Sequence, residues 1–213
     1  IKDVIRKGNY DTTKPSEWPD NLLLKFAHDL RHLTKPMILA ANKCDKPQAK
    51  TNLETLKQNY PELTIIPCSA DSELALREAA KAELIEYLPG ESDFQIKTTP
   101  NEKQQQALDK IKQTVLQPYK STGVQEILNN IILNQLKYIA IFPAGANKLA
   151  DSKGNILPDC FLLKDGSTAL DFAYALHSDF GDNFIKAIDV KTKQAVGKDH
   201  KLKHRDGLEI MTR

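Results

Sequence analysis

The residues Asn42, Lys43, Cys44 and Asp45 form a run whose side chains could read a purine base. The carboxylate of Asp45 can accept two hydrogen bonds from guanine, one from N1–H and one from the exocyclic amine, whereas adenine offers no such pair of donors. Asn42 can bridge the loop and the purine edge, and the aliphatic stem of Lys43 can lie along the face of the base. The order Asn-Lys-x-Asp therefore predicts a loop that binds guanine.

Two apolar runs are expected to hold this loop in place. Residues 36–41 come directly before it and have the pattern of a buried strand. Residues 63–66 form a second apolar run that leads into Ser69-Ala70, and a helical stretch, 52–60, separates the two. The order strand, Asn-Lys-x-Asp, helix, strand, Ser-Ala resembles that of the last two nucleotide-contacting loops of Ras-like GTPases.

In that resemblance the backbone of Ser69 and Ala70 contacts O6 of guanine. The alternative is that Ser69 or Asp71 only caps the helix that follows, because Ser and Asp are favoured N-cap residues. Paired with the upstream Asn-Lys-x-Asp, the pattern favours nucleotide binding.

The sequence contains no Gly-x-x-x-x-Gly-Lys-Ser/Thr loop for phosphates, and its one Gly-Lys pair, Gly197-Lys198, is followed by Asp199. The chain also begins at Ile1 rather than at a methionine. We therefore expect the phosphate loop, the Mg²⁺ ligand and any catalytic group to lie in a preceding half. This chain alone should then not hydrolyse nucleotide, since hydrolysis depends mainly on positioning and neutralising the phosphates.

Length and composition predict one large domain or two small ones. The 213 residues are 40% hydrophobic and 27% charged, which is ordinary for a globular protein. The net charge of +2 is too small to indicate nucleic-acid binding by itself. Three widely spaced cysteines fit neither a disulfide framework nor a zinc site and favour a reducing cytoplasm. No apolar run reaches the ~20 residues that a membrane-spanning helix needs.

Helical spacing dominates much of the first 136 residues. Asp20 is expected to cap a helix that ends near Leu33. A long helix is predicted from Leu74 to Leu88, ending at Pro89-Gly90, and residues 91–100 read as a connector. Two further helical patterns, 107–116 and 124–132, are separated by a break from Pro118 to Gly123.

The periodicity becomes strand-like at about Lys137. Strands are predicted at 138–143, within 156–164, at 184–190 and at 208–211. Thr168-x-x-Asp171 is a capping signal for a helix over 169–177, which Gly181 would close. Strands that surround a single helix predict an α+β fold in which the helix crosses a mixed sheet.

This last block closely resembles a TGS domain, a ubiquitin-like β-grasp module. The matching segments are Ile139–Pro143, Leu162–Thr168, Asp171–His177, Asp179–Gly181, Ala187–Asp189, Leu202 and Asp206–Ile210. The resemblance implies that Gly166 makes the turn into the helix, that Phe172 and Leu176 face the sheet, and that Gly181 leaves the helix with positive φ.

A guanine-type loop followed by such a module resembles the Obg-like superfamily, specifically the archaeal-type branch of the YchF subfamily. Residues 87–94 and 121–125 resemble short sequence motifs of that branch. The resemblance implies an α/β fold, the C-terminal half of a Rossmann-like P-loop G domain with helical additions, followed by the α+β β-grasp domain. We expect the first domain over 1–136, with a helical insert at roughly 72–118, and the TGS domain over 137–213.

The same resemblance implies a GTP-binding protein that acts as a slow, nucleotide-dependent switch on the ribosome, with GTP or GDP as ligand and Mg²⁺ only in the intact protein. Bacterial and eukaryotic YchF relatives have Asn-x-x-Glu at this loop and prefer ATP. Asp45 restores the guanine-type pattern and favours GTP, while ATP stays an alternative. A non-enzymatic module that binds RNA or protein under nucleotide control is a second alternative.

A basic segment lies near the C-terminus and could contact ribosomal or transfer RNA. Its cations are Lys191, Lys193, Lys198, Lys201, Lys203 and Arg205. The alternative is a solvated hairpin, because lysines commonly protect sheet edges. His28 and His32 are spaced like a pair of metal ligands, but no third ligand is evident, so a solvated helix face is favoured and no metal is predicted.

Overall fold

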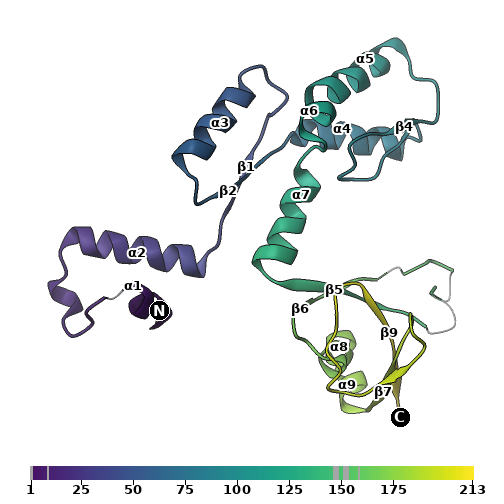
Figure 1. The fold of residues 1–213 in the computed structure, drawn as a ribbon. Coiled ribbons are helices and arrows are strands. Elements are labelled where there is room, and N and C mark those ends of the chain that lie inside the picture. The colour runs from purple at the N-terminus through teal and green to yellow at the C-terminus, as the bar shows by residue number, and fades with distance from the viewer. Residues whose placement is uncertain (1, 9, 146–148, 151–153, 158) are drawn as a thin grey trace. The chain divides into compact units, whose positions relative to one another are not determined.

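The computed structural model describes residues 2–8, 10–145, 149–150, 154–157 and 159–213. Its backbone contacts divide the chain into two compact units, Ile1–Leu128 and Asn129–Arg213, and each is described by itself (Figure 1). The predicted boundary between residues 136 and 137 stays a prediction. The mixed α/β character expected from the sequence is confirmed, with a small parallel sheet in the first unit and a β-grasp sheet in the second.

The first unit begins with helical elements that are held by aromatic contacts. Helix α1 spans Lys2–Gly8, the 3₁₀ helix η1 spans Pro15–Glu17 and α2 spans Asp20–Thr34. The rings of Tyr10 and Phe26 lie 5.1 Å apart in an edge-on arrangement. The expected cap by Asp20 is wrong: Pro19 is the N-cap residue, and its carbonyl accepts the first helical N–H groups.

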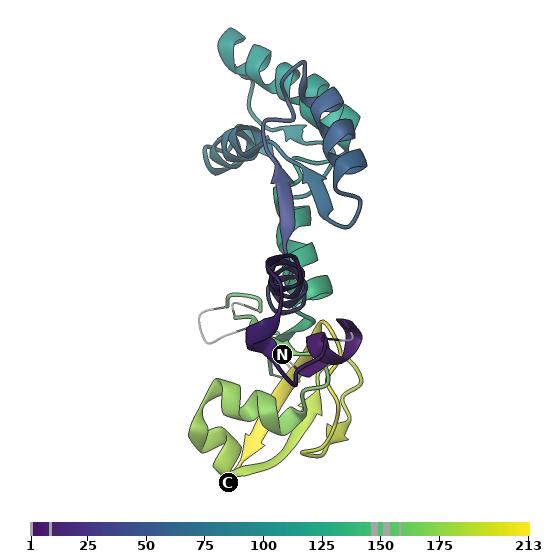
Figure 2. The ribbon, with the colours of Figure 1, turned by 90° about the vertical axis from the view of Figure 1, so that its left-hand side faces the viewer.

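Strands β1 (Ile38–Ala41) and β2 (Thr64–Pro67) form a parallel pair, and α3 (Ala49–Asn59) connects them (Figure 2). Residue Ile38 pairs with Thr64 at one end and Ala41 pairs with Pro67 at the other. Because the strands are parallel, their carboxyl ends lie at the same edge of the sheet. The loops that follow them therefore start side by side.

The predicted long helix is wrong beyond Lys81. Helix α4 spans Ala70–Lys81, and Glu83 then takes a φ of 57°, which reverses the chain. Strand β3 (Ile85–Glu86) follows and pairs antiparallel with β4 (Gln95–Ile96), which lies in the expected connector. The side chain of Ile85 is nevertheless buried in the core, where it is 1% exposed. An apolar residue at this position is therefore buried from a strand rather than from the predicted helix.

Further helical segments complete the first unit and begin the second, which starts at Asn129. They are α5 (Glu102–Ile111), the π-helix η2 (Lys112–Leu116), α6 (Gln117–Tyr119), α7 (Val124–Asn129) and the π-helix η3 (Asn130–Gln135). The predicted break is confirmed as a turn in which Lys120 and Gly123 have positive φ. A core of Leu76, Ile85, Leu108, Ile111 and Leu116 packs α4 against α5 and β3.

The second unit is a mixed five-stranded sheet of order β6-β5-β9-β7-β8. The strands are β5 (Tyr138–Pro143), β6 (Phe161–Lys164), β7 (Phe184–Asp189), β8 (Ala195–Val196) and β9 (Asp206–Thr212). The central pair β5 and β9 is parallel and the other pairs are antiparallel. This sheet with its crossing helix is the predicted β-grasp arrangement.

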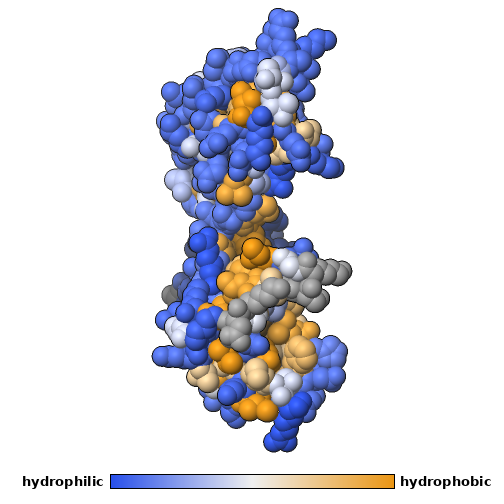
Figure 3. Space-filling view, turned by 90° about the vertical axis from the view of Figure 1, so that its right-hand side faces the viewer, coloured by the Kyte–Doolittle hydropathy of each residue, from blue (hydrophilic) through white to orange (hydrophobic). Residues whose placement is uncertain are grey.

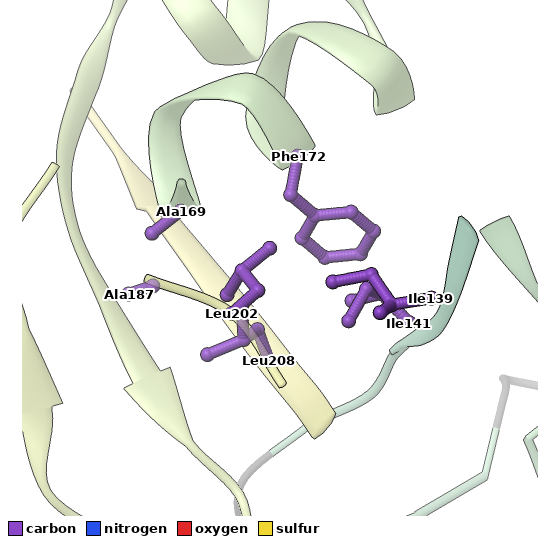
Figure 4. Close-up of a cluster of buried hydrophobic side chains, with 7 residues drawn as sticks. All are labelled: Ile139, Ile141, Ala169, Phe172, Ala187, Leu202 and Leu208. Carbon is purple, nitrogen blue, oxygen red and sulfur yellow. The ribbon is translucent and has the colours of Figure 1, made fainter. Parts of the chain in front are cut away.

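Helix α8 (Ala169–Leu176) covers one face of this sheet, and the short α9 (Ser178–Asp182) follows it. The predicted capping box is confirmed, because Thr168 and Asp171 exchange hydrogen bonds between side chain and backbone. Figure 4 shows the ring of Phe172 directed from α8 toward Ile139 and Ile141. Figure 3 shows one face of the molecule, on which hydrophobic residues are exposed among hydrophilic ones.

One glycine has a different role from the predicted one. Gly181 lies inside α9 and has no positive φ, so it does not end a helix in a left-handed conformation. A Cβ atom on Gly181 would lie 2.2 Å from the ring of Tyr174. Glycine is therefore needed because an aromatic ring packs on the backbone. Gly166, by contrast, has a positive φ of 88° in the turn that precedes α8.

Candidate functional site

The carboxyl ends of β1 and β2 bring the two predicted base-binding loops together. The N–H of Cys68 donates to the carbonyl of Ala41 at 3.0 Å, and the N–H of Cys44 donates to the carbonyl of Cys68 at 3.0 Å. Backbone hydrogen bonds between the segments continue past the last paired residues of the strands. The loop of Asn42–Asp45 and the segment that begins α4 therefore form one polar surface.

Asn42 ties these two loops to each other. Its side-chain Oδ1 accepts hydrogen bonds from the N–H of Lys43 at 2.8 Å and from the N–H of Ala70 at 3.1 Å. Lys43 has a φ of 65°, a left-handed conformation that is uncommon for a lysine. The loop thus turns sharply just after Asn42, and its exposed Lys43 is next to the bridging amide.

Asp45 lies within hydrogen-bond reach of Ser69. Its Oδ1 accepts from the hydroxyl of Ser69 at 3.3 Å, its Oδ2 lies 3.1 Å from Nζ of Lys46, and its side chain is 18% exposed. Partial burial acts to raise the pKa of Asp45, but hydrogen bonds from Lys46 and Ser69 hold that pKa below its ordinary value. Asp45 is therefore a carboxylate at neutral pH, and it can act as an acceptor.

The capping role of Ser69 is confirmed, whereas its contact with guanine stays a prediction. Ser69 is the N-cap residue of α4, with its hydroxyl accepting from the N–H of Ser72. The same hydroxyl lies 2.8 Å from the hydroxyl of Ser72 and 3.3 Å from Oδ1 of Asp45. The backbone N–H of Ser69 donates to the carbonyl of Thr122 at 2.9 Å. With the N–H of Ala70 directed to Asn42, a guanine O6 would have to share or take over that donor.

A cavity of about 360 Å³ lies beside the loop, between β1 and α3. Asn42, Lys43 and Lys46 form its polar side, and Leu53 and Leu56 belong to its apolar side. Asp45, Ser69 and Ala70 are not among its lining residues. The cavity is therefore adjacent to the carboxylate in sequence, through Cys44 and Lys46, but is not lined by it.

A third segment, Ser121–Gly123, packs against this surface, a contact that was not predicted from the sequence. Thr122 is fully buried, and Gly123 lies so close to the second loop that a Cβ atom would meet the carbonyl oxygen of Pro67 at 2.0 Å. Besides the family resemblance of residues 121–125, the local signal is Gly123, which takes a φ of 79°. What it packs against is distant in sequence and is not encoded in any short pattern.

Behind this segment lies a buried carboxylate, Glu73, on the first turns of α4. It accepts hydrogen bonds from Thr122 at 2.6 Å, from Arg77 at 2.6 Å and from Tyr87 at 2.8 Å. Burial acts to raise the pKa of Glu73, but these three donors outweigh it, and the pKa lies below the ordinary value. Burial and the bond to Glu73 together raise the pKa of Tyr87 to about 12.

Acidification is expected to destabilise the first unit through Glu73. Because its folded pKa lies below the ordinary 4.5, its ionisation stabilises the fold above that pH, and the contribution is lost as the pH falls through the folded pKa. Urea unfolding measured from pH 7 downward should show this loss in the wild type. The Glu73→Gln variant, which has no such proton to bind, should show a smaller loss over the same range, and equal losses would contradict the assignment.

The predicted RNA-contacting residues all lie on the surface of the second unit, around β8 and the connection to β9. Contacts within the unit engage some of these cations: Nζ of Lys201 donates to the carbonyl of Gly166 at 2.6 Å, and Nζ of Lys191 lies 3.5 Å from Asp206. Strand β8 is at the edge of the sheet, so protection of that edge also accounts for lysines there.

Among the described residues, no group of three or more potential ligands could hold a metal ion. The rings of His28 and His32 lie 4.7 Å apart on α2. Within the residues that the structure describes, no helix is both long and apolar enough to cross a membrane.

Comparison with protein-family models gives two adjoining matches. Residues 40–145 match the model described as Obg-like GTPase YGR210-like, G4 motif-containing domain. Residues 143–212 match the TGS domain. The first match includes both loops, the Ser121–Gly123 segment and strand β5, and the second includes the other four strands of the β-grasp sheet and its helices.

Curated relatives are similar to this chain along much of its length. It is 45% identical over its full length to GTP-binding protein MJ1332 of Methanocaldococcus jannaschii and covers 53% of that protein. It is 27% identical over 168 residues, 74% of its length, to GTP-binding protein C428.15 of Schizosaccharomyces pombe and covers 41% of it. The chain thus spans about half the length of these relatives, or less.

Two solved structures are similar to the full chain. A crystal structure of a GTP binding protein from Pyrococcus horikoshii matches 100% of the chain, at 36% identity and a TM-score of 0.65, and the chain covers 56% of that protein. The YchF GTPase of Schizosaccharomyces pombe matches 99% of the chain, at 16% identity and a TM-score of 0.51, with 54% of it covered. The second likeness is one of fold alone.

Proposed function

Because this chain belongs to the Obg-like GTPase family, with a G4 motif-containing domain followed by a TGS domain, we propose that it is the base-reading and TGS portion of a GTP-binding protein of the Obg/YchF type. The contact between Asp45 and Ser69 carries the proposal. It holds an ionised carboxylate, partly exposed, at the shared end of two parallel strands, which is where open α/β sheets bind their ligands.

Guanine is the base that this carboxylate fits. Asp45 offers only acceptors, so it pairs with the two donors on one edge of guanine and meets no such pair on adenine. In this proposal Asn42 fixes the loop, Lys43 lies along the base, and the segment of Ser69 and Ala70 supports O6. The names of the similar proteins, which describe them as GTP-binding, support the same base.

The remaining parts of the activity belong to the intact protein. The sequence has no phosphate-loop motif, so in this proposal residues outside the chain bind the phosphates and Mg²⁺ and carry out slow hydrolysis. The chain alone then has no hydrolase activity. The three free cysteines, two of them buried, support a cytoplasmic location.

Calorimetric titration of the intact protein with GDP and with ADP tests the base preference. We expect GDP to bind at least about tenfold more tightly, because a site built around specific hydrogen bonds discriminates strongly against a partner that lacks them. Equal affinities, or tighter binding of ADP, would instead favour the ATP-preferring alternative.

A second function, contact with RNA of the ribosome or with transfer RNA, is supported by the basic segment of the second unit. Its cations are exposed, and they come from the β7–β8 turn and from the connection between β8 and β9. Cations on a shared surface can neutralise phosphates without reading sequence. In this proposal the nucleotide state regulates the binding, and the TGS domain provides the contact surface.

Binding of transfer RNA at several salt concentrations tests this second function. The logarithm of the binding constant should fall linearly with the logarithm of the salt concentration. Changing Lys198, Lys203 and Arg205 to alanine should make that slope less steep by about one for each lost phosphate contact. The matched control changes Lys50, Lys57 and Lys103, which are exposed on the first unit, and should leave the slope unchanged. A wild-type affinity that does not respond to salt would exclude a phosphate-binding face.

A further inference from the structure

The buried carboxylate of Glu73 and the Ser121–Gly123 segment form a polar cluster directly behind the candidate base-binding loops. Glu73 is 4% exposed and Thr122 is fully buried, and the hydroxyl of Thr122 donates to Oε2 of Glu73 at 2.6 Å. The base-reading role described above uses neither residue. Such a cluster is costly to bury unless every member is hydrogen-bonded, and among the described residues no buried side-chain polar atom lacks a partner.

A continuous series of hydrogen bonds leads from this cluster to the carboxylate at the surface. The carbonyl of Thr122 accepts from the N–H of Ser69 at 2.9 Å, and the hydroxyl of Ser69 lies 3.3 Å from Oδ1 of Asp45. The side chain of Thr122 is thus held by Glu73, while its backbone holds Ser69. Gly123 adds a close backbone contact to the same loop through the carbonyl of Pro67.

We propose that Glu73 and Thr122 are positioning residues for base selection, which hold Ser69 where its hydroxyl can orient the Asp45 carboxylate. The inference rests on the proposed function, because it assigns these residues to the same base-reading site. Neither residue touches the base. Their contribution is geometric: a hydrogen bond weakens steeply when its donor is misaligned, so a loosened Ser69 segment leaves Asp45 free to turn away from the guanine edge.

The charge of Glu73 makes this arrangement rigid. Arg77 donates to Oε1 and the hydroxyls of Thr122 and Tyr87 donate to Oε2, so both oxygens are held. Hydrogen bonds to an ionised acceptor are shorter and stronger than neutral ones. Removal of the Thr122 hydroxyl would leave Oε2 of the buried Glu73 carboxylate with one donor fewer. The Thr122 backbone, which accepts from Ser69, would then be held less firmly.

The test compares Thr122→Val, Thr122→Ser and Arg77→Gln in the intact protein. We expect Thr122→Val to weaken GDP binding about tenfold and to leave ADP binding within twofold, because ADP makes no use of the Asp45 contact. Thr122→Ser keeps the hydroxyl and should restore the wild-type ratio. Arg77→Gln removes the charged donor from Oε1 of Glu73 but leaves the Thr122 hydroxyl on Oε2, so it should lower the GDP to ADP ratio by less than Thr122→Val does.

Hydrogen exchange gives a second readout that needs no nucleotide. Peptides that contain residues 68–70 should exchange at least about tenfold faster in Thr122→Val than in the wild type, and at the wild-type rate in Thr122→Ser. Unchanged exchange in Thr122→Val, or equal weakening of GDP and ADP binding, would overturn the inference. A wild type without guanine preference would refute the proposed function instead, and the exchange result would still decide whether Thr122 holds the segment.

Discussion

Replacing Asp45 with alanine is expected to abolish the preference for guanine in the intact protein. The change removes two charge-assisted hydrogen bonds to N1–H and the exocyclic amine, together about 3 kcal/mol, so the Kd for GDP should rise roughly 100-fold. The Kd for ADP should change little, because adenine makes neither bond. Titration calorimetry with both nucleotides measures the two values directly.

Two variants serve as controls for this result. Lys46→Ala removes the exposed partner of Asp45 and should change the Kd for GDP by less than about fivefold, since exposed ion pairs contribute little. Asp45→Glu keeps the charge but extends the side chain by one methylene, and should lower the ratio of GDP to ADP affinity. Equal weakening of both nucleotides by Asp45→Ala would mean that the residue supports the fold rather than reads the base.

Replacing Phe172 with alanine is expected to destabilise the second unit by about 3–5 kcal/mol. The side chain is fully buried between α8 and the sheet, and its ring meets that of Phe161 edge-on at 5.9 Å. Truncation would remove this contact and leave a cavity beside Ile139 and Ile141 (Figure 4). Whole domains are stable by only about 5–15 kcal/mol, so the loss is a large share of the total.

Hydrogen exchange of the amides in β5 and β9 measures this effect within the intact chain. The matched control is Phe180→Ala, the same substitution at an α9 ring that is 44% exposed, which should change protection only slightly. If Phe172→Ala left the protection of these strands unaltered, Phe172 would not be the centre of the core.

Elements that are encoded locally could be predicted from the sequence. Strands β1 and β2 follow from two short apolar runs, and the capping box of α8 follows from Thr168 and Asp171, which are three residues apart. Four strands of the β-grasp unit, β5, β6, β7 and β9, were predictable from their own apolar patterns, whereas the two-residue β8 was not predicted. The Asn-Lys-x-Asp loop was recognisable because its four residues are consecutive.

The rest depended on contacts that are distant in sequence. Leu84, Ile85 and Leu88 are spaced as in a helix, but the positive φ of Glu83 turns the chain and pairs β3 with β4, which no periodicity records. The bond between Glu73 and Thr122 joins residues 49 positions apart. Its partners are an ordinary helical glutamate and an ordinary loop threonine until the fold brings them together.

The hydrogen bond between Glu73 and Thr122 also closes a long segment of the chain into a loop. The segment between Glu73 and Thr122 contains β3, β4, α5 and α6, and its two ends, 49 positions apart, are joined by this hydrogen bond. The entropic cost of closing such a loop grows only logarithmically, about 0.6 kcal/mol for each doubling of length. Insertions and deletions accumulated during evolution should therefore concentrate in this loop, whereas the spacing from Asp45 to Ser69 should stay nearly constant.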